Sequence, residues 1–372
     1  MPTPRKRRLV LGLLVSSLTL AVAGTAGYLV WSSSLGKMWI KSTFKNPIGP
    51  TGELDARTAI NFFDLNRIGN KFIYDPLAYL IPKPNQTSNW DWPEHPAGRF
   101  RIVTNDLGLR EDASVTPDKR GPRILVAGDS HTGGLVNNSE TFANQLEVTL
   151  AAAEGWKDVD VVNAGVPFTG PSCYLGILKK YLYLKPDVFI AVLFTGNDFV
   201  DDLRLRYVLD GWSLPRAGGK YREQLRTATE QHPAGLYQGF NQAVRWKHFP
   251  REMERSLEVV VQSYRNIQTL CTENGITFLA VVLPTKMDVD SDDMEAREAI
   301  REVLGMTPED VGLNRQLGDR FAETVRAAGI HCFDPTDVMA AHEEPLYWTQ
   351  DYHLGLAGHT LLARELFEVL SQ

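Results

Sequence analysis

The sequence has little cysteine: Cys173, Cys271 and Cys332 are the only three in a chain of 372 residues. No two of them have C-x-x-C spacing, which excludes the common zinc-binding and dithiol redox motifs. An oxidising compartment would allow one disulfide and leave one thiol over. Each cysteine lies in or beside an apolar segment, so we expect all three to be small residues of the core.

Basic clusters are also scarce once the first few residues are past. The formal net charge is −6, and no later segment has the density of Lys and Arg that nucleic-acid binding requires. The sequence has no glycine-rich loop of the phosphate-binding or dinucleotide-binding form, and no histidines and carboxylates at zinc-ligand spacing. It therefore predicts no cofactor, no metal and no nucleic-acid partner.

The amino terminus is basic and then apolar. Arg5–Arg8 precede an uncharged run from Leu9 to Trp31, and about 20 apolar residues suffice to cross a bilayer. The positive-inside rule then places the body of the protein outside the cytoplasm. Two interpretations stay open: a signal anchor over residues 1–36, or secretion after cleavage of a signal peptide at Ala21–Ala23. We favour the anchor, because the apolar run continues to Trp31 with aromatic residues that suit a membrane interface.

Residues 37–119 show no clear periodicity and are rich in proline. We interpret them as a linker followed by an irregular or β-rich preamble. Phe100–Val103 is a candidate strand, and Asn105–Gly108 is a turn signal.

From residue 120 to residue 372, short apolar runs alternate with helical patterns. The expected strands are 123–127, 158–163, 188–194, 276–283 and 330–333, and the expected helices are 141–154, 172–184, one around 257–271, 313–328 and 357–370. This alternation predicts β-α-β units, and therefore an α/β fold of three layers, α/β/α, with a mostly parallel sheet. An insertion at about 201–250 interrupts this alternation, and we expect it near the carboxyl edge of the sheet. Two interpretations stay open: that it lines or covers a site there, or that it is a surface excursion without a role in the site.

The first apolar strand of this domain stops abruptly at Gly128-Asp129-Ser130. Ligands of open α/β sheets bind just beyond the carboxyl ends of such strands, so Ser130 lies where a nucleophile would act. Serine is also a favoured helix N-cap, and this motif alone does not separate the two roles.

Three more polar motifs follow later strands or precede the last helix. They are Asn163-Ala164-Gly165, Thr195-Gly196-Asn197-Asp198 and Asp351-Tyr352-His353. Together with Gly128-Asp129-Ser130 they resemble the four blocks of the SGNH hydrolases, also called GDSL-type esterases. The resemblance covers about residues 123–372 and implies that family's flavodoxin-like fold.

The resemblance also implies roles for individual residues. Ser130 is the expected nucleophile, His353 the base that takes its proton, and Asp351 the acid that holds the imidazole. The backbone amides of Ser130 and Gly165 and the side chain of Asn197 are the expected oxyanion donors. His131 and Asp198, which directly follow Ser130 and Asn197, are candidate substrate contacts, and a capping role stays open for each. Many members of the family carry another residue at the position of His131.

Other polar residues near these motifs depart from the pattern or have structural roles. The family commonly places the acid three residues before the histidine, where this chain has Gln350, so we assign the role to Asp351. Asp129 is expected to shape the turn, and His359 is expected to be structural.

The implied function is a serine esterase that hydrolyses acyl esters, short-chain or acetyl, on an envelope carbohydrate. Trp212, Trp246 and Tyr237 are candidate sugar-stacking residues, although aromatic residues of an insertion commonly serve packing alone. An O-acyltransferase would use the same serine, and a catalytically silent binding or scaffold module would use none of these residues chemically. The partners expected are therefore an acyl-ester substrate and, through residues 1–36, a membrane.

Overall fold

The computed structural model describes Leu54 and residues 56–212, 214–215, 218–232, 236–292 and 294–371, with the exception of the Tyr237 side chain. The expected anchor at 1–36 and the first part of the linker lie outside these residues. Within the described ranges, no helix combines the length and the apolar character needed to span a membrane.

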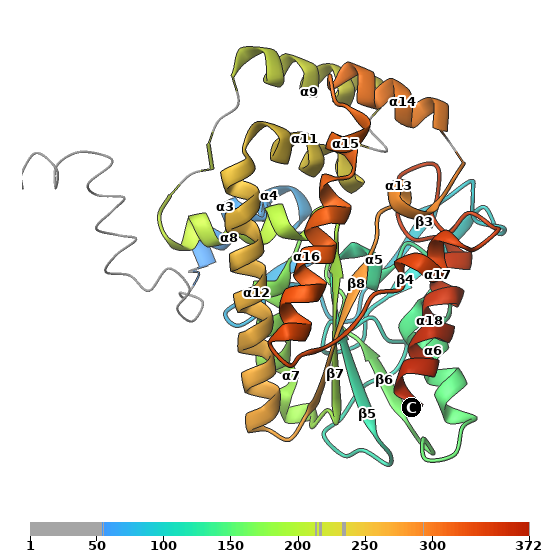
Figure 1. Cartoon of the computed structure of the whole chain (residues 1–372). Coiled ribbons are helices and arrows are strands. Elements are labelled where there is room, and N and C mark those ends of the chain that lie inside the picture. Colours follow the sequence, from blue (N-terminus) through green and yellow to red (C-terminus); the bar gives the residue numbers. More distant parts are fainter. Residues whose placement is uncertain are drawn as a thin grey trace, which may run out of the picture. The chain divides into compact units, whose positions relative to one another are not determined.

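A five-stranded parallel sheet forms the centre of the fold (Figure 1). Its strands are β5 (Arg123–Ala127), β6 (Asp160–Asn163), β7 (Val188–Phe194), β8 (Thr277–Leu283) and β9 (His331–Phe333), in the order β6-β5-β7-β8-β9. The chain leaves β5 to one side for β6 and then returns to the other side for β7. Ligands of open α/β sheets bind where the winding reverses in this way, which here is the carboxyl end of β5 and β7.

Both faces of the sheet are covered, as the unbroken apolar runs predict. Ile124 and Val126 of β5 pack on one side with α6 (Phe142–Ala151) and α18 (Leu356–Leu370). The alternate residues Leu125 and Ala127 pack on the other side, with the helices α7 (Pro171–Tyr181), α12 (Pro250–Glu273) and α16 (Leu313–Ala327). The predicted three-layer α/β/α architecture is therefore confirmed.

The predicted elements agree with the structure to within a few residues at most ends. The strand predicted at 276–283 begins one residue later, and the helix predicted at 172–184 ends at Tyr181, followed by the single 3-10 turn η2 (Leu182–Leu184). Cys173 and Cys271 are buried and Cys332 is partly buried, and each is a free thiol.

The described part of the preamble contains two short helices and two antiparallel hairpins. These are α3 (Ala56–Phe62), α4 (Leu65–Ile68), β1 (Phe72–Asp75) with β2 (Tyr79–Pro82), and β3 (Thr87–Asp91) with β4 (Arg99–Val103). The hairpin β1–β2 packs tightly on α7, where a Cβ on Gly176 would lie 2.1 Å from the Leu77 carbonyl oxygen. The preamble thus shares one hydrophobic core with the sheet.

The insertion expected at 201–250 is largely helical. It contains α8 (Asp198–Leu209), α9 (Gly219–Gln231), the π-turn η3 (Leu236–Phe240) and α11 (Asn241–His248). A second excursion, which the sequence did not indicate, follows β8 and holds α13 (Lys286–Val289), α14 (Met294–Val303) and α15 (Pro308–Val311). Helices α9 and α14 lie side by side at the top of Figure 1 and, with η3 and α11, enclose a small separate core.

Candidate active site

The nucleophile candidate begins a very short helix at the end of β5. Helix α5 (Ser130–Gly133) is capped by Asp129, whose carboxylate accepts the His131 amide at 2.9 Å. Asp129 therefore shapes the turn, as expected. The amide of Ser130 occupies the first helical position, where a helix offers its N–H groups no internal acceptor.

Ser130, His353 and Asp351 meet in one hydrogen-bonded row. The His353 Nε2 atom lies 2.9 Å from the Ser130 Oγ, and the His353 Nδ1 atom lies 2.7 Å from an Asp351 carboxylate oxygen. The His353 side chain is 12% exposed. Its burial lowers the pKa of the imidazole, but the charge and hydrogen bond of Asp351 outweigh burial and raise that pKa above the usual value. This is the arrangement that a serine nucleophile, its base and its orienting acid require.

The two-residue spacing between acid and base depends on Tyr352. Its φ of 63° is left-handed, an uncommon conformation for a residue other than glycine. The turn brings both oxygens of Asp351 to His353, because one also accepts the His353 amide at 3.0 Å. Gln350 lies at the position that the family commonly uses for the acid, and here its backbone amide donates to the Glu94 carboxylate.

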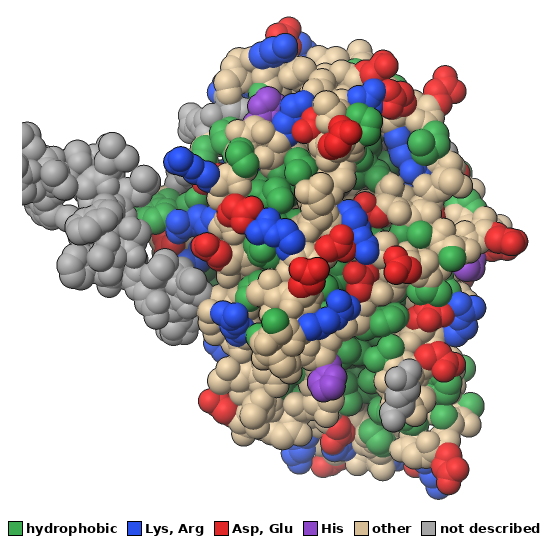
Figure 2. All heavy atoms as spheres, in the orientation of Figure 1, with side chains coloured by type: hydrophobic (Ala, Val, Ile, Leu, Met, Phe, Trp, Pro, Cys, Tyr) green, Lys and Arg blue, Asp and Glu red, His purple; other side chains and the backbone are tan. Residues whose placement is uncertain are grey.

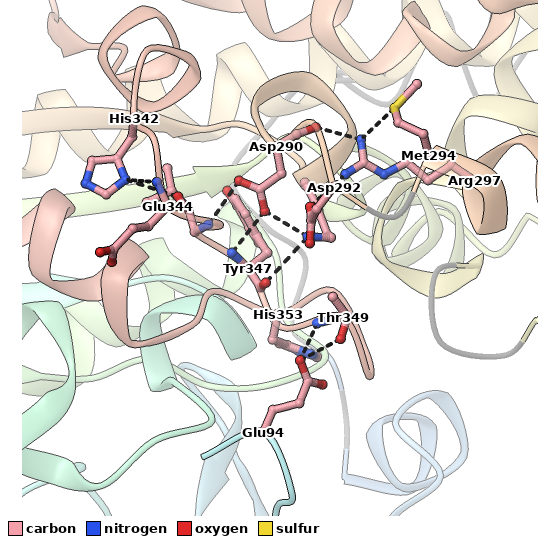
Figure 3. Close-up of polar contacts among 12 residues, drawn as sticks. Glu94, Asp290, Asp292, Met294, Arg297, His342, Glu344, Tyr347, Thr349 and His353 are labelled. Carbon is pink, nitrogen blue, oxygen red and sulfur yellow. Dashed lines mark hydrogen bonds and ion pairs between the residues drawn. The ribbon is translucent and has the colours of Figure 1, made fainter. Parts of the chain in front are cut away.

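Charged side chains, two of them buried, hold the loop that carries Asp351 and His353 (Figure 3). Asp290 accepts the amides of Leu346 and Tyr347 at 3.0 and 3.1 Å, and the buried Lys286 binds Asp290 at 2.9 Å. On the other side, Glu94 of the preamble accepts the Thr349 amide at 2.7 Å. Sequence reasoning missed all three charged residues; only the spacing of Lys286 and Asp290, one helical turn apart, gave a local signal.

Arg110 fixes the loop that follows the nucleophile. Its guanidinium donates to the carbonyl oxygens of Gly133, Gly134 and Val136, and its Nε atom lies 3.1 Å from the Asn138 Oδ1. Burial lowers the pKa of this arginine to about 9. Because buried carbonyl groups without a partner are costly, Arg110 stabilises the chain immediately after Ser130.

The candidate oxyanion donors all line one cleft, beyond the ends of β5, β6 and β7. Gly165 approaches α5 so closely that a Cβ there would lie 2.2 Å from the Gly133 amide nitrogen. The Gly165 amide donates to Asn163 at 3.0 Å, so that an oxyanion would have to share it. The buried Oδ1 of Asn197 has no hydrogen-bond partner among the described residues. The oxyanion role of these groups stays a prediction.

The placement of His131 and Asp198 corrects their expected role as substrate contacts. His131 is buried, stacks against the His353 ring at 4.7 Å, and accepts the Leu354 amide through Nδ1 at 3.2 Å. Asp198 is buried below the sheet edge, where it accepts the Tyr174 hydroxyl at 2.9 Å. Both side chains are buried beneath the site and do not line the cleft.

His359 is structural, as expected. Its Nδ1 accepts the Phe142 amide at the start of α6 at 3.2 Å. Trp246 is buried in the core, and Trp212 packs against the same core. The described residues contain no group of three or more His, Cys, Asp or Glu side chains that could hold a metal ion.

The cleft above Ser130 and His353 has a volume of about 1340 Å³. Its walls come from the preamble, from the edge of the sheet, and from the insertion, which thus lines the site as the first of its two interpretations predicts. Aromatic residues of the lining lie mainly in the preamble and beside it: Phe62, Phe63, Phe72, Trp90 and Phe168. The sequence did not indicate these residues, because the preamble shows no periodicity.

No protein-family model matches this chain, and no curated protein matches it in sequence. Among solved structures, it is similar to a G-D-S-L family protein from Desulfitobacterium hafniense DCB-2, with 15% identity and a TM-score of 0.38 over 67% of this chain and 99% of that one. It is also similar to the acetyl xylan esterase AlAXEase, with 13% identity and a TM-score of 0.37 over 67% and 99% of the two chains.

A third similar structure is a GDSL-like lipase from Bacteroides thetaiotaomicron VPI-5482, with 12% identity and a TM-score of 0.35 over 67% of this chain and 88% of that one. At such identities and TM-scores the likeness assigns no reaction, so the chemistry has to come from this chain's own side chains.

Proposed function

We propose that this protein is an SGNH hydrolase that cleaves carboxylic esters through Ser130. The observation that carries the proposal is the contact of His353 with both Ser130 and Asp351, at 2.9 and 2.7 Å. The three residues come from distant parts of the sequence, and a scaffold protein would have no need to bring them together with this geometry. The hydrogen-bonded row therefore favours an enzyme over a silent binding module.

The reaction follows from the positions of these atoms. The Ser130 oxygen attacks the ester carbonyl carbon while His353 Nε2 takes the hydroxyl proton. The oxyanion is stabilised by the Ser130 amide and by the Asn197 and Gly165 donors. The intermediate collapses to an acyl-serine, and His353 returns the proton to the departing alcohol. Water then attacks the acyl-serine with His353 again as base, releasing the free acid and restoring Ser130.

The size and lining of the cleft support a large ester substrate, such as an acylated carbohydrate. Its volume of about 1340 Å³ exceeds the roughly 300–1,000 Å³ of common small-ligand pockets. The Phe168 side chain is 53% exposed, and an exposed aromatic face in a cleft can stack against a sugar ring. An O-acyltransferase would form the same acyl-serine and would pass it to a sugar hydroxyl in place of water.

A panel of acyl esters tests the proposed reaction. With 4-nitrophenyl esters from acetyl to decanoyl, we expect the highest kcat/KM for acetyl and stoichiometric release of free acid. A sugar acceptor is then added, and the appearance of its O-acetyl product in place of free acetate would identify a transferase. No hydrolysis and no transfer with any ester would contradict the proposal.

We also propose that residues 9–31 anchor the protein in a membrane, with the catalytic domain outside the cytoplasm. The support is the uncharged run that follows Arg5–Arg8. The full chain is expected to remain with membranes during extraction at alkaline pH and to be released by detergent. Recovery of a protein that begins after Ala23 from the soluble fraction would instead identify a cleaved signal peptide.

A further inference from the structure

The cleft is basic, although the protein as a whole is acidic. Arg110, which is engaged with backbone carbonyl groups, lines it together with five other cationic side chains: Arg67, Lys71, Arg204, Arg222 and Arg245. Only two carboxylates of the described chain, Asp64 and Asp201, line the same cleft. The whole sequence carries a net charge of −6, and the face in Figure 2 shows acidic and basic side chains interspersed. A cleft whose charged side chains are mostly positive attracts and concentrates negatively charged ligands.

Arg204 lies on α8 and Arg245 lies on α11, and the side chain of Gln242 connects these two helices by a hydrogen bond. Gln242 of α11 accepts the Val200 amide of α8 at 3.0 Å and donates to the Thr195 carbonyl oxygen at 2.6 Å. Arg245 follows Gln242 by three residues and therefore lies on the same side of α11. Arg204 lies seven residues beyond Asn197 on α8, which corresponds to a rise of about 10 Å.

The guanidinium group of Arg245, which is partly buried, makes few hydrogen bonds within the described residues. Its Nε atom is buried and has no hydrogen-bond partner among the described residues, and its Nη2 atom lies 3.5 Å from the Pro215 carbonyl oxygen. Burial lowers the pKa of this arginine, and the nearby charge of Arg204 lowers it further against the opposing effect of Tyr221 and Glu252. One oxygen of the Glu252 carboxylate accepts the Tyr207 hydroxyl at 2.7 Å.

Arg204 is paired only loosely. It contacts Asp201 at 3.2 Å, its side chain is 53% exposed, and exposed pairs of this kind contribute little. Its guanidinium also lies 6.0 Å from the centre of the Phe62 ring. Both guanidinium groups therefore line the cleft, and among the carboxylates of the described cleft lining only Asp201 pairs with either of them, through its contact with Arg204. An anionic ligand would supply the missing partner.

We propose that the alcohol part of the ester substrate carries a negative charge, a carboxylate or a phosphate, which Arg204 and Arg245 bind. This inference rests on the proposed ester hydrolysis and adds the substrate class. We expect the anion about 10 Å from the oxyanion donors, because Arg204 follows Asn197 by about that rise along the axis of α8. Guanidinium groups bind both carboxylate and phosphate in two-point contacts, which gives orientation as well as affinity.

The test compares two esters that differ only in charge: 4′-acetoxybiphenyl-4-carboxylate and its carboxamide. We expect a kcat/KM about tenfold higher for the carboxylate, the size of one charge-assisted hydrogen bond, with a preference that shrinks as salt is added. Arg245→Gln and the more exposed Arg204→Gln should each remove most of this preference. The matched control is Arg226→Gln, which removes a charge from the exposed side of α9, where Arg226 pairs with Glu230.

Equal kcat/KM for the two esters in the wild type, or a preference that survives both cleft substitutions, would overturn the proposal. If the wild type hydrolysed neither ester, the ester hydrolysis itself would be at fault. Calorimetry with the Ser130→Ala variant then decides the charge preference separately: tighter binding of the carboxylate supports it, and equal binding refutes it.

Two natural sources of such an ester are separated by product analysis. Acetate released from an acetylated uronic-acid oligosaccharide would identify a carboxylate-bearing carbohydrate, and acetate released from an acetylated sugar phosphate would identify a phosphate-bearing one. Either result supports the proposal. Cleavage of neutral acetylated xylan oligosaccharides with no cleavage of the two anionic substrates would refute it.

Discussion

Ser130→Ala is expected to lower kcat for ester hydrolysis by about 10⁴- to 10⁶-fold. The reason is that the Ser130 oxygen forms the covalent acyl intermediate, and His353 has no other hydroxyl at 2.9 Å from which to take a proton in the described structure. Only binding and the oxyanion donors would remain to assist a direct attack by water. The measurement is initial-rate kinetics with 4-nitrophenyl acetate on purified, folded protein.

The matched control is Ser139→Ala. Ser139 is exposed and lies nine positions further along the chain, so its substitution should change kcat by less than about twofold and unfolding free energy by less than about 0.5 kcal/mol. If Ser130→Ala kept more than a tenth of the activity, another residue would have to be the nucleophile, and the assignment of this site would be wrong.

Asp351→Asn should reduce kcat by about 10³- to 10⁴-fold while leaving the fold unchanged. An asparagine has the shape of aspartate and can still accept the His353 amide, but it carries no charge to stabilise the protonated imidazole. The Asp351 carboxylate also opposes the burial that lowers the pKa of His353. In the variant, that pKa should therefore fall.

The pH dependence of kcat/KM provides a separate measurement of the effect of Asp351 on the His353 pKa. His353 acts as a base only when neutral, so wild-type kcat/KM should rise as the pH passes upward through the His353 pKa, which Asp351 raises above the usual value for histidine. In Asp351→Asn this acidic limb should move to lower pH. The control is Gln350→Glu, which adds a carboxylate at the position common in the family. Its kcat should stay close to wild type, and little loss of kcat in Asp351→Asn would contradict the role of Asp351.

The sheet and its two helical layers could be predicted because the burial of both sheet faces requires short, continuous apolar runs, which are visible in the sequence. A strand such as Val188–Phe194 is apolar at every position, and helices such as α12 carry an apolar residue at each turn. The site motifs could be predicted because each follows a strand whose end is visible in the sequence. Topology then brings β5, β6 and β7 to a common edge.

The surroundings of the site could not be predicted, because they depend on contacts between segments far apart in the chain. Arg110 donates to a carbonyl oxygen of the loop after Ser130, and Glu94 accepts an amide of the loop before Asp351. The sequence around Arg110 and Glu94 contains no pattern that predicts these contacts. The same holds for the aromatic lining contributed by Phe72 and Trp90. Short helices such as α13 and α15 have too few turns to show a periodicity.

His131 and Asp198 show a different limit. Each directly follows a predicted site residue, and adjacency in sequence suggested contact with substrate. In a helical turn, however, neighbouring residues point in directions about 100° apart. Ser130 and Asn197 therefore face the cleft, and the residues after them point into the protein, where His131 supports His353.

The most direct test of the account is covalent labelling with a fluorophosphonate, in which the serine oxygen bonds to phosphorus and fluoride leaves. Intact-mass measurement of the folded wild type should show a single adduct, and peptide mapping should place it on Ser130. The Ser130→Ala variant should gain no mass, and Asp351→Asn should react more slowly. A folded wild type that stays unlabelled, or that carries its adduct on another serine, would contradict the central claim that Ser130 is an activated nucleophile.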